Sequence, residues 1–114
     1  MLVKAGEGIK EYKVIRNGIG EIQVVNKFGP DETANRCSLV AELWVEPGQS
    51  TGYHDHTTNI EIMYMLEGEL VCIEDGEEKI LKPGDTTSSC NGSKHQITNR
   101  TDKIAKILAL VINW

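Results

Sequence analysis

The sequence predicts an all-β fold, either a sandwich or a closed barrel. Almost every apolar run is short, is rich in valine and isoleucine, and ends at glycine, proline or Asp-Gly, which is typical of successive strands. These turn signals recur at the short intervals expected of a sandwich or barrel. A chain of 114 residues has the length of one domain, and we expect a single domain over residues 1–114.

Seven segments are expected to be strands. In chain order they are residues 21–27, 36–45, 61–66, 69–74, 79–81, 95–98 and 104–112. Asp75-Gly76 favours a two-residue turn with positive φ angles, so a hairpin is expected between the fourth and fifth segments. Further turns are expected at Pro47-Gly48, Pro83-Gly84 and Asn91-Gly92. Residues 1–20 have no clear place in a barrel and are interpreted as an N-terminal extension or a strand exchanged in a dimer.

Composition excludes several classes of protein. Twelve Lys and Arg residues against 17 Asp and Glu give a net charge of −5, so no basic stripe is available for a phosphate backbone and nucleic acid is not an expected partner. No run approaches the ~20 apolar residues of a membrane span, and no signal-peptide core is present, so we expect a cytoplasmic protein without a membrane partner. Three widely spaced cysteines indicate neither a disulfide framework nor a zinc ribbon.

All three histidines fall in two segments bounded by glycines. The first segment contains, at fixed spacing, Gly48, His54, His56, Glu61 and Gly68. The second contains Gly84, Cys90, Gly92, His95 and Asn99. Chance matching of the four glycines alone is rare, at roughly two in 100,000 registers for a glycine usage of ~7%.

These two spacings resemble the paired motifs of the cupin superfamily, with the short spacer of its smallest members. The resemblance covers residues 48–68 and 84–99 directly and extends with the flanking strands to about residues 36–112. It implies a double-stranded β-helix, or jelly-roll, cupin barrel that binds one divalent metal ion through His54, His56, Glu61 and His95. One position departs from the motif, because Cys90 stands where proline is usual, but no metal ligand is lost.

The spacing also makes physical sense without the resemblance. Side chains two apart on a strand share a face, so His54 and His56 point the same way and can reach one ion. Glu61 re-enters on the next strand, and closing the barrel brings His95 from a distant strand. An inward carboxylate needs a partner, which a cation supplies. For any single histidine, a solvated surface residue is the commoner interpretation, and a purely structural metal is an alternative for the set.

The ligand set narrows the choice of metal without deciding it. Imidazole with one carboxylate suits iron, nickel, manganese, zinc, copper or cobalt. Four protein ligands would tend to close a four-coordinate zinc site, whereas six-coordinate iron, nickel or manganese keeps two positions for other molecules. We therefore favour Fe, Ni or Mn, with Zn, Cu or Co as alternatives.

The pocket is expected to be small and mostly apolar. Counting by twos along the strands places around it Leu43, Met63, Ile97, Ile107 and Ala109. Ordinary barrel core is the alternative interpretation of these residues. No Arg or Lys falls on the inward strand positions, which argues against a sugar phosphate or dicarboxylate and for a small neutral or aromatic ligand.

Two functions are left open by this site. The first is a metal-dependent oxygenase or isomerase of a small organic molecule. The second is a metal- or small-ligand-binding module without turnover. We also expect a homodimer, because residues 21–25 have no obvious partner strand in a minimal barrel. Aromatic contacts for its interface could come from Trp44, Tyr64 and Trp114, which could equally pack between sheets.

Overall fold

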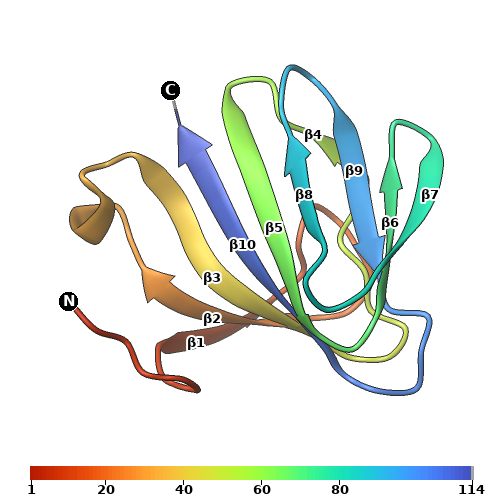
Figure 1. Ribbon diagram of the computed structural model, residues 1–114, viewed down its shortest axis with the longest axis horizontal. Helices are drawn as coiled ribbons and strands as arrows, with labels where there is room; N and C mark the ends of the chain where they lie inside the picture. The colour runs from red at the N-terminus through yellow and green to blue at the C-terminus, as the bar shows by residue number, and fades with distance from the viewer. Residues whose placement is uncertain (114) are drawn as a thin grey trace.

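The computed structural model describes residues 1–113 as two antiparallel sheets (Figure 1). The larger sheet has six strands in the order β1-β2-β3-β10-β5-β8, and the smaller has four in the order β4-β9-β6-β7. Their bounds are β1 Ile9–Lys13, β2 Ile22–Phe28, β3 Cys37–Val45, β4 His54–Asp55, β5 Asn59–Glu67, β6 Leu70–Glu74, β7 Glu77–Leu81, β8 Thr86–Ser89, β9 Lys94–Thr98 and β10 Ala105–Asn113. A short 3-10 helix, η1, spans Asp31–Thr33. The predicted all-β jelly-roll fold is confirmed.

Turn chemistry accounts for the confirmed hairpin and for a second turn. Glu74 pairs with Glu77 across the β6–β7 turn, where Asp75 and Gly76 have φ angles of 48° and 82°. Two successive positive φ angles match the twist of the flanking strands, and aspartate and glycine are among the residues that tolerate them. Asn91-Gly92 has the same pair of positive φ angles, 55° and 81°, in the turn that carries the chain from β8 in the larger sheet to β9 in the smaller one.

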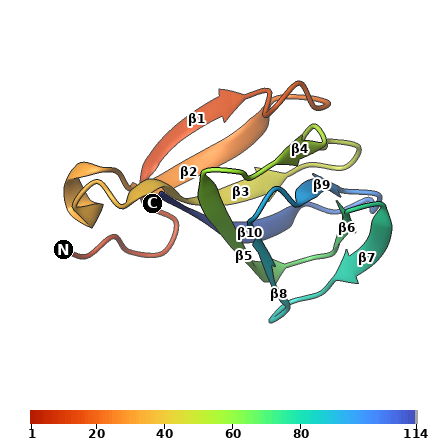
Figure 2. The same ribbon diagram turned by 90° about the horizontal axis from the view of Figure 1, so that it is seen from above.

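Three strands, β1, β4 and β8, were not expected from the apolar pattern, and all three lie at sheet edges. Figures 1 and 2 show β1 at one end of the larger sheet and β8 at the other. Every residue of β1 is exposed, and β8 has the sequence Thr-Thr-Ser-Ser. An edge strand is held by main-chain hydrogen bonds on one side, so it needs no run of apolar side chains.

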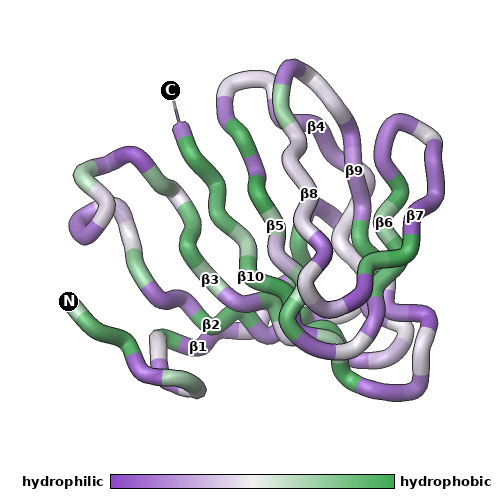
Figure 3. The backbone as a smooth tube through the Cα atoms, viewed as in Figure 1, coloured by the Kyte–Doolittle hydropathy of each residue, from purple (hydrophilic) through white to green (hydrophobic). Residues whose placement is uncertain are grey.

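The core lies between the inward faces of the two sheets. Its buried residues on the larger sheet include Ala41, Leu43, Val45, Met63, Met65, Ala105, Ile107 and Ala109, and the smaller sheet adds Leu70, Cys72, Leu81 and Ile97. Figure 3 shows hydrophobic residues recurring along β5 and β10. Each large aliphatic side chain that is fully buried here stabilises the fold by about 1.5–3 kcal/mol. This core fixes the strands that carry the site.

Two motif residues serve the fold rather than the site. Gly68 turns the chain from β5 to β6 with a φ angle of 76°, and a Cβ there would lie 2.8 Å from the carbonyl oxygen of Ile104. Asn99 is fully buried, and its side-chain nitrogen donates to the carbonyl oxygens of Val45 and Lys103, both at 2.8 Å. These bonds tie the β9–β10 connection to the end of β3.

The argument for a homodimer from an unpaired strand is wrong, because β2 has two partners in its own chain. It pairs with β1 through Ile9↔Asn26 and with β3 through Gln23↔Trp44. The homodimer itself stays a prediction. Of the aromatic residues assigned to its interface, Tyr64 is exposed and Trp44 is partly buried beneath the ammonium group of a lysine, whereas Trp114 lies outside the described residues.

Candidate metal centre

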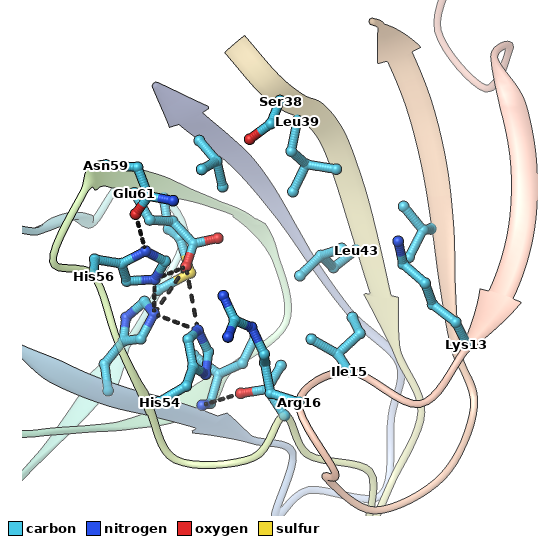
Figure 4. Close-up of a pocket in the computed structure, with 16 residues that line it drawn as sticks. Lys13, Ile15, Arg16, Ser38, Leu39, Leu43, His54, His56, Asn59 and Glu61 are labelled. Carbon is cyan, nitrogen blue, oxygen red and sulfur yellow. Dashed lines mark hydrogen bonds and ion pairs between the residues drawn. The ribbon is translucent and has the colours of Figure 1, made fainter. Parts of the chain in front are cut away.

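Four side chains converge at one point inside the fold. His54 lies on β4, His56 follows that strand, Glu61 lies on β5 and His95 lies on β9. One nitrogen or oxygen from each residue lies within 4.8 Å of the others. The Nε2 atom of His95 is 3.1 Å from Nε2 of both other imidazoles and 2.8 Å from Oε1 of Glu61 (Figure 4). The structure thus brings together all four residues predicted to be ligands, in a cluster that could hold a metal ion.

Strand pairing explains the convergence. His54 and His95 are directly opposite each other where β4 pairs with β9 in the smaller sheet. Glu61 belongs to the larger sheet, where it lies opposite Ser89 of β8. The cluster therefore spans both sheets, and it forms only when the two sheets pack face to face.

Hydrogen bonds fix the orientation of the first two imidazoles. Nδ1 of His54 lies 2.7 Å from the carbonyl oxygen of Gly52, and Nδ1 of His56 lies 2.6 Å from the amide oxygen of Asn59. Carbonyl and amide oxygens only accept, so both imidazoles donate from Nδ1. The Nε2 atom of each neutral ring then carries the lone pair that faces the cluster.

The third imidazole has a different partner. Nδ1 of His95 lies 3.1 Å from the hydroxyl oxygen of Ser89, and that hydroxyl donates to the carboxylate of Glu74 at 3.3 Å. A hydroxyl that donates to the carboxylate accepts from the imidazole, so His95 also presents an unprotonated Nε2. Acceptors of this kind behind a ligating histidine hold the ring and increase its basicity.

This arrangement requires a cation. Three lone pairs and a carboxylate oxygen face one another at about hydrogen-bond distance, and they repel unless a proton or a metal ion lies among them. Three imidazole nitrogens and one carboxylate oxygen are a donor set for first-row divalent metals. The residues therefore fit the metal that the sequence implied.

Electrostatics inside the cluster agree with this requirement. Burial of Glu61 opposes ionisation, but the imidazoles of His54, His56 and His95 around the carboxylate outweigh burial and hold the pKa of Glu61 well below its usual range. The hydrogen bond to Glu61 raises the pKa of His56, against the effect of burial. A proton on an imidazole thus takes the place of the cation when no metal is bound. The guanidinium of Arg16 is close enough to lower the pKa of His56 somewhat.

A cavity of about 200 Å³ opens beside the cluster. Of the five residues predicted to line the pocket, Leu43, Met63 and Ile97 do line it. Ile107 and Ala109 are fully buried in the core and are not among the lining residues within 1–113. In the sheet register, Ala109 lies opposite Met63 and Ile107 lies opposite Leu43. The side chains of Met63 and Leu43 line the cavity in their place.

Sequence reasoning missed three lining residues from the N-terminal segment, Lys13, Ile15 and Arg16. The cavity is also lined by Val24, Ser38, Leu39, Thr51, Asn59 and Val111. Figure 4 shows the guanidinium of Arg16 reaching towards the cluster. The expectation that no cationic side chain reaches the pocket is wrong, because the segment before β2 supplies both Lys13 and Arg16. The argument against an anionic ligand therefore loses its premise.

Arg16 is held by an unusual turn. Arg16 and Asn17 have φ angles of 53° and 61°, a left-handed conformation that costs non-glycine residues on the order of 1–2 kcal/mol each. The amides of Gly18 and Gly52 both donate to the carbonyl oxygen of Ile15 at 3.0 Å. A Cβ on Gly52 would overlap the carbonyl oxygen of Arg16. The turn is thus fitted against the segment that leads into β4.

Comparisons with known proteins agree with this fold and site. The cupin domain model matches residues 42–112. The oxalate-binding protein of Thermotoga maritima is 31% identical over 113 residues, which cover 98% of this chain and 93% of that protein. The tetracenomycin polyketide synthase protein TcmJ of Streptomyces glaucescens is 27% identical over 79 residues, which cover 69% of this chain and 53% of that protein.

Solved structures give the same result. The crystal structure of a predicted oxalate decarboxylase from Thermotoga maritima covers 100% of both chains with a TM-score of 0.94 and 30% identity. A cupin 2 conserved barrel domain protein from Salinispora arenicola has a TM-score of 0.73 and 22% identity over 90% of this chain and 82% of that one, which shows the fold alone. With a family model over more than half its length, this chain belongs to the cupin family.

Proposed function

We propose that this chain binds a small carboxylate anion of the oxalate class at a divalent metal ion held by His54, His56, Glu61 and His95. The observation that carries the proposal is the cluster itself, whose four inward-facing acceptors need a cation. The choice of oxalate as the ligand class is supported by two similar proteins that are named for oxalate. Arg16, whose guanidinium reaches towards the cluster, gives its charge.

Charge in the cavity favours an anion over the neutral ligand expected from sequence. A divalent ion beside the carboxylate of Glu61 keeps one positive charge, and Arg16 adds a second. A bound ion would act as a Lewis acid and accept a carboxylate oxygen from the ligand. The guanidinium of Arg16 suits a second carboxylate oxygen, because its planar donors match that geometry. The partly enclosed cavity strengthens both interactions relative to water.

The metal is proposed to be iron, nickel or manganese, with zinc, copper or cobalt as alternatives. Four protein ligands on one side leave the cavity side for the anion, which a six-coordinate ion accommodates and a four-coordinate zinc site does not. Elemental analysis of the purified protein identifies the ion. One equivalent of zinc in a protein that does not bind added oxalate would contradict the choice of iron, nickel or manganese.

Turnover of the bound molecule, by oxygenase- or isomerase-type chemistry, is the second candidate function. It is favoured by the free cavity side of the cluster. It is opposed by the lining of the cavity. Of the residues within 1–113 that line it, Glu61 is the only one with a carboxylate, so the cavity offers no second acid for proton transfer. Oxalate recovered unchanged after prolonged incubation with metal-loaded protein and oxygen would support binding without turnover.

The binding proposal is tested by calorimetric titration of the metal-loaded protein with oxalate and with oxamide, its neutral isostere. Oxalate should bind, and oxamide should bind far more weakly. Arg16→Gln should weaken oxalate about ten- to hundredfold, the factor for losing a charge-assisted hydrogen bond. Arg100→Gln, which removes an exposed arginine paired with Glu78, is the matched control. Equal binding of oxalate and oxamide, or full oxalate affinity in Arg16→Gln, would contradict the proposal.

A homodimer is proposed through the outward face of the larger sheet. By alternation along β3, β5 and β10, this face carries apolar side chains that include Val40, Trp44, Tyr64, Leu108 and Leu110, all of them at least partly exposed. Light scattering should give twice the chain mass of 12.6 kDa, and a monomer at micromolar concentration would contradict the dimer. Within residues 1–113 no helix is long and apolar enough to cross a membrane; the cytoplasmic location stays a prediction.

A further inference from the structure

The cavity beside the cluster has two unlike ends. One end is polar and holds the histidine and glutamate cluster with Arg16. The other end is lined by apolar side chains: Ile15, Val24, Leu39, Leu43 and Val111. Figure 4 shows Ile15, Leu39 and Leu43 across the cavity from the cluster, with Arg16 reaching between. A ligand as small as oxalate, in which both carbons are carboxylate carbons, uses only the polar end.

Sheet register gives the extent of the apolar end. Glu61 on β5 lies opposite Val111 on β10, which lies opposite Leu39 on β3. Leu43 on β3 in turn lies opposite Val24 on β2. Neighbouring strands are about 4.8 Å apart, so the floor of the cavity crosses three strand spacings, roughly 14 Å, from the cluster to β2. The apolar end therefore extends well beyond any group that contacts the ion.

The residues at this end of the cavity belong to the edge of the hydrophobic core: Val24 and Leu43 are buried in it, and Ile15 and Leu39 pack against it. Core residues such as Met65 and Ile107 are fully buried without lining the cavity. The apolar lining residues instead surround open space, in a cavity of about 200 Å³. Water in such a space finds few hydrogen-bond partners, because the walls offer mainly methyl and methylene groups, with the Ser38 hydroxyl beside Leu39. An apolar group of a ligand fills it better.

Among residues 1–113, the basic residue at the far rim of the cavity already has an acidic partner. Lys13 is the basic residue there, and its ammonium group lies 3.5 Å from the carboxylate of Glu11. Arg16 is the cationic side chain that Figure 4 shows reaching towards the cluster. The charge pattern thus favours one anionic head and an uncharged tail, rather than a long molecule with an anion at each end.

We propose that the ligand this cavity fits best is a 2-oxo carboxylate with an apolar tail of several carbons. This inference rests on the proposed function and deepens it. A 2-oxo acid shares with oxalate two oxygens on adjacent carbons, so its head has the same means of binding a divalent ion and Arg16. Its tail lies along Leu39, Leu43 and Val111 and removes apolar surface from water.

A chain-length series on the unaltered, metal-loaded protein tests the inference. Calorimetric titrations would use oxalate and the straight 2-oxo acids from pyruvate to 2-oxohexanoate. Each added methylene group should raise affinity about fourfold, the factor expected for burying one CH₂, until the cavity is filled. Affinity that stays flat or falls with length, while oxalate binds, overturns this inference alone. If neither oxalate nor any 2-oxo acid binds the loaded protein, the proposed function fails with it.

A paired substitution locates the tail. Leu39→Phe narrows the apolar end, and the ratio of 2-oxohexanoate affinity to pyruvate affinity should fall at least tenfold. Val40→Phe adds the same bulk to the opposite face of the same strand and should leave that ratio unchanged. Circular dichroism shows whether each variant folds, and the chain-length series needs neither variant. An unchanged ratio in a folded Leu39→Phe protein would place the tail elsewhere and overturn the assignment.

Discussion

The two walls of the cavity differ in what holds them. The cluster wall consists of buried or half-buried side chains from both sheets, and a hydrogen bond at Nδ1 fixes each of its three imidazoles. The second wall comes from the N-terminal segment and includes Arg16, an exposed residue on a turn that is held by backbone hydrogen bonds to residues 50–52. We infer that the first wall determines metal affinity and the second determines which ligand binds. Substitutions on the two walls should therefore have separable effects.

Removal of the metal should have the largest effect on ligand binding. Dialysis against a strong chelator removes the ion, and oxalate affinity should then fall at least a hundredfold, because Arg16 alone holds the anion. Calorimetry before and after dialysis measures the loss, and readdition of the metal should restore binding. Undiminished oxalate binding by the chelated protein would show that the ligand does not use the cluster.

Loss of the Ser89 hydroxyl, which lies behind His95, should lower metal affinity without a direct effect on the ligand. Ser89→Ala removes the acceptor of the Nδ1 hydrogen bond, which is part of the link to Glu74, and such changes lower metal affinity about 10- to 100-fold. Competition with a metal-binding dye measures the affinity. Ser88→Ala, at the exposed neighbouring position, is the control and should change it less than twofold. Equal affinities in the two variants would remove Ser89 from the account.

A substitution beneath the Arg16 turn should lower ligand affinity and leave metal content unchanged. A Cβ at Gly18 would overlap the carbonyl oxygen of Ser50, so Gly18→Ala should displace the turn and cost about 1–3 kcal/mol of stability. Oxalate affinity should fall about tenfold while metal content stays at one equivalent. Gly76→Ala is also strained, because the φ angle of Gly76 is 82°, so it controls for a general loss of stability, and ligand affinity should not change. Loss of metal from Gly18→Ala would show that the two walls are not separable.

The pH dependence should differ between loaded and metal-free protein. The raised pKa of His56 stabilises the metal-free fold below about pH 6.5, and this contribution is lost as the pH rises through the folded pKa. The lowered pKa of Glu61 stabilises the fold above about pH 4.3, and this contribution is lost as the pH falls through the folded pKa. The metal-free melting temperature should therefore peak between these values.

Bound metal should stabilise the fold more at higher pH, unlike the proton on His56. The ion competes with protons for the imidazoles, so metal affinity falls as the pH drops towards and below the raised pKa of His56. The melting temperature gained on loading should thus be larger at pH 8 than at pH 6. A gain that is the same at both values would indicate that no imidazole loses a proton on binding.

The contrast between the walls also explains what sequence could predict. The ligands stand at short, fixed spacings, and His54 and Glu61 reach the cluster through local strand and turn geometry. The barrel strands could also be predicted from the sequence, because alternating apolar residues mark a buried face. Edge strands β1 and β8 depend on main-chain bonds, which leave no apolar pattern. Arg16 was hidden for a similar reason: its position depends on a left-handed turn and on contacts with a segment more than thirty residues away.

Elemental analysis of the purified protein beside a His54→Ala, His56→Ala double variant tests the central claim most directly. The account predicts one divalent ion per native chain and less than a tenth of that in the variant, because two of the four ligands are gone. Circular dichroism confirms that the variant keeps its strands. Stoichiometric metal retained by a folded double variant would contradict the claim that this cluster binds the ion.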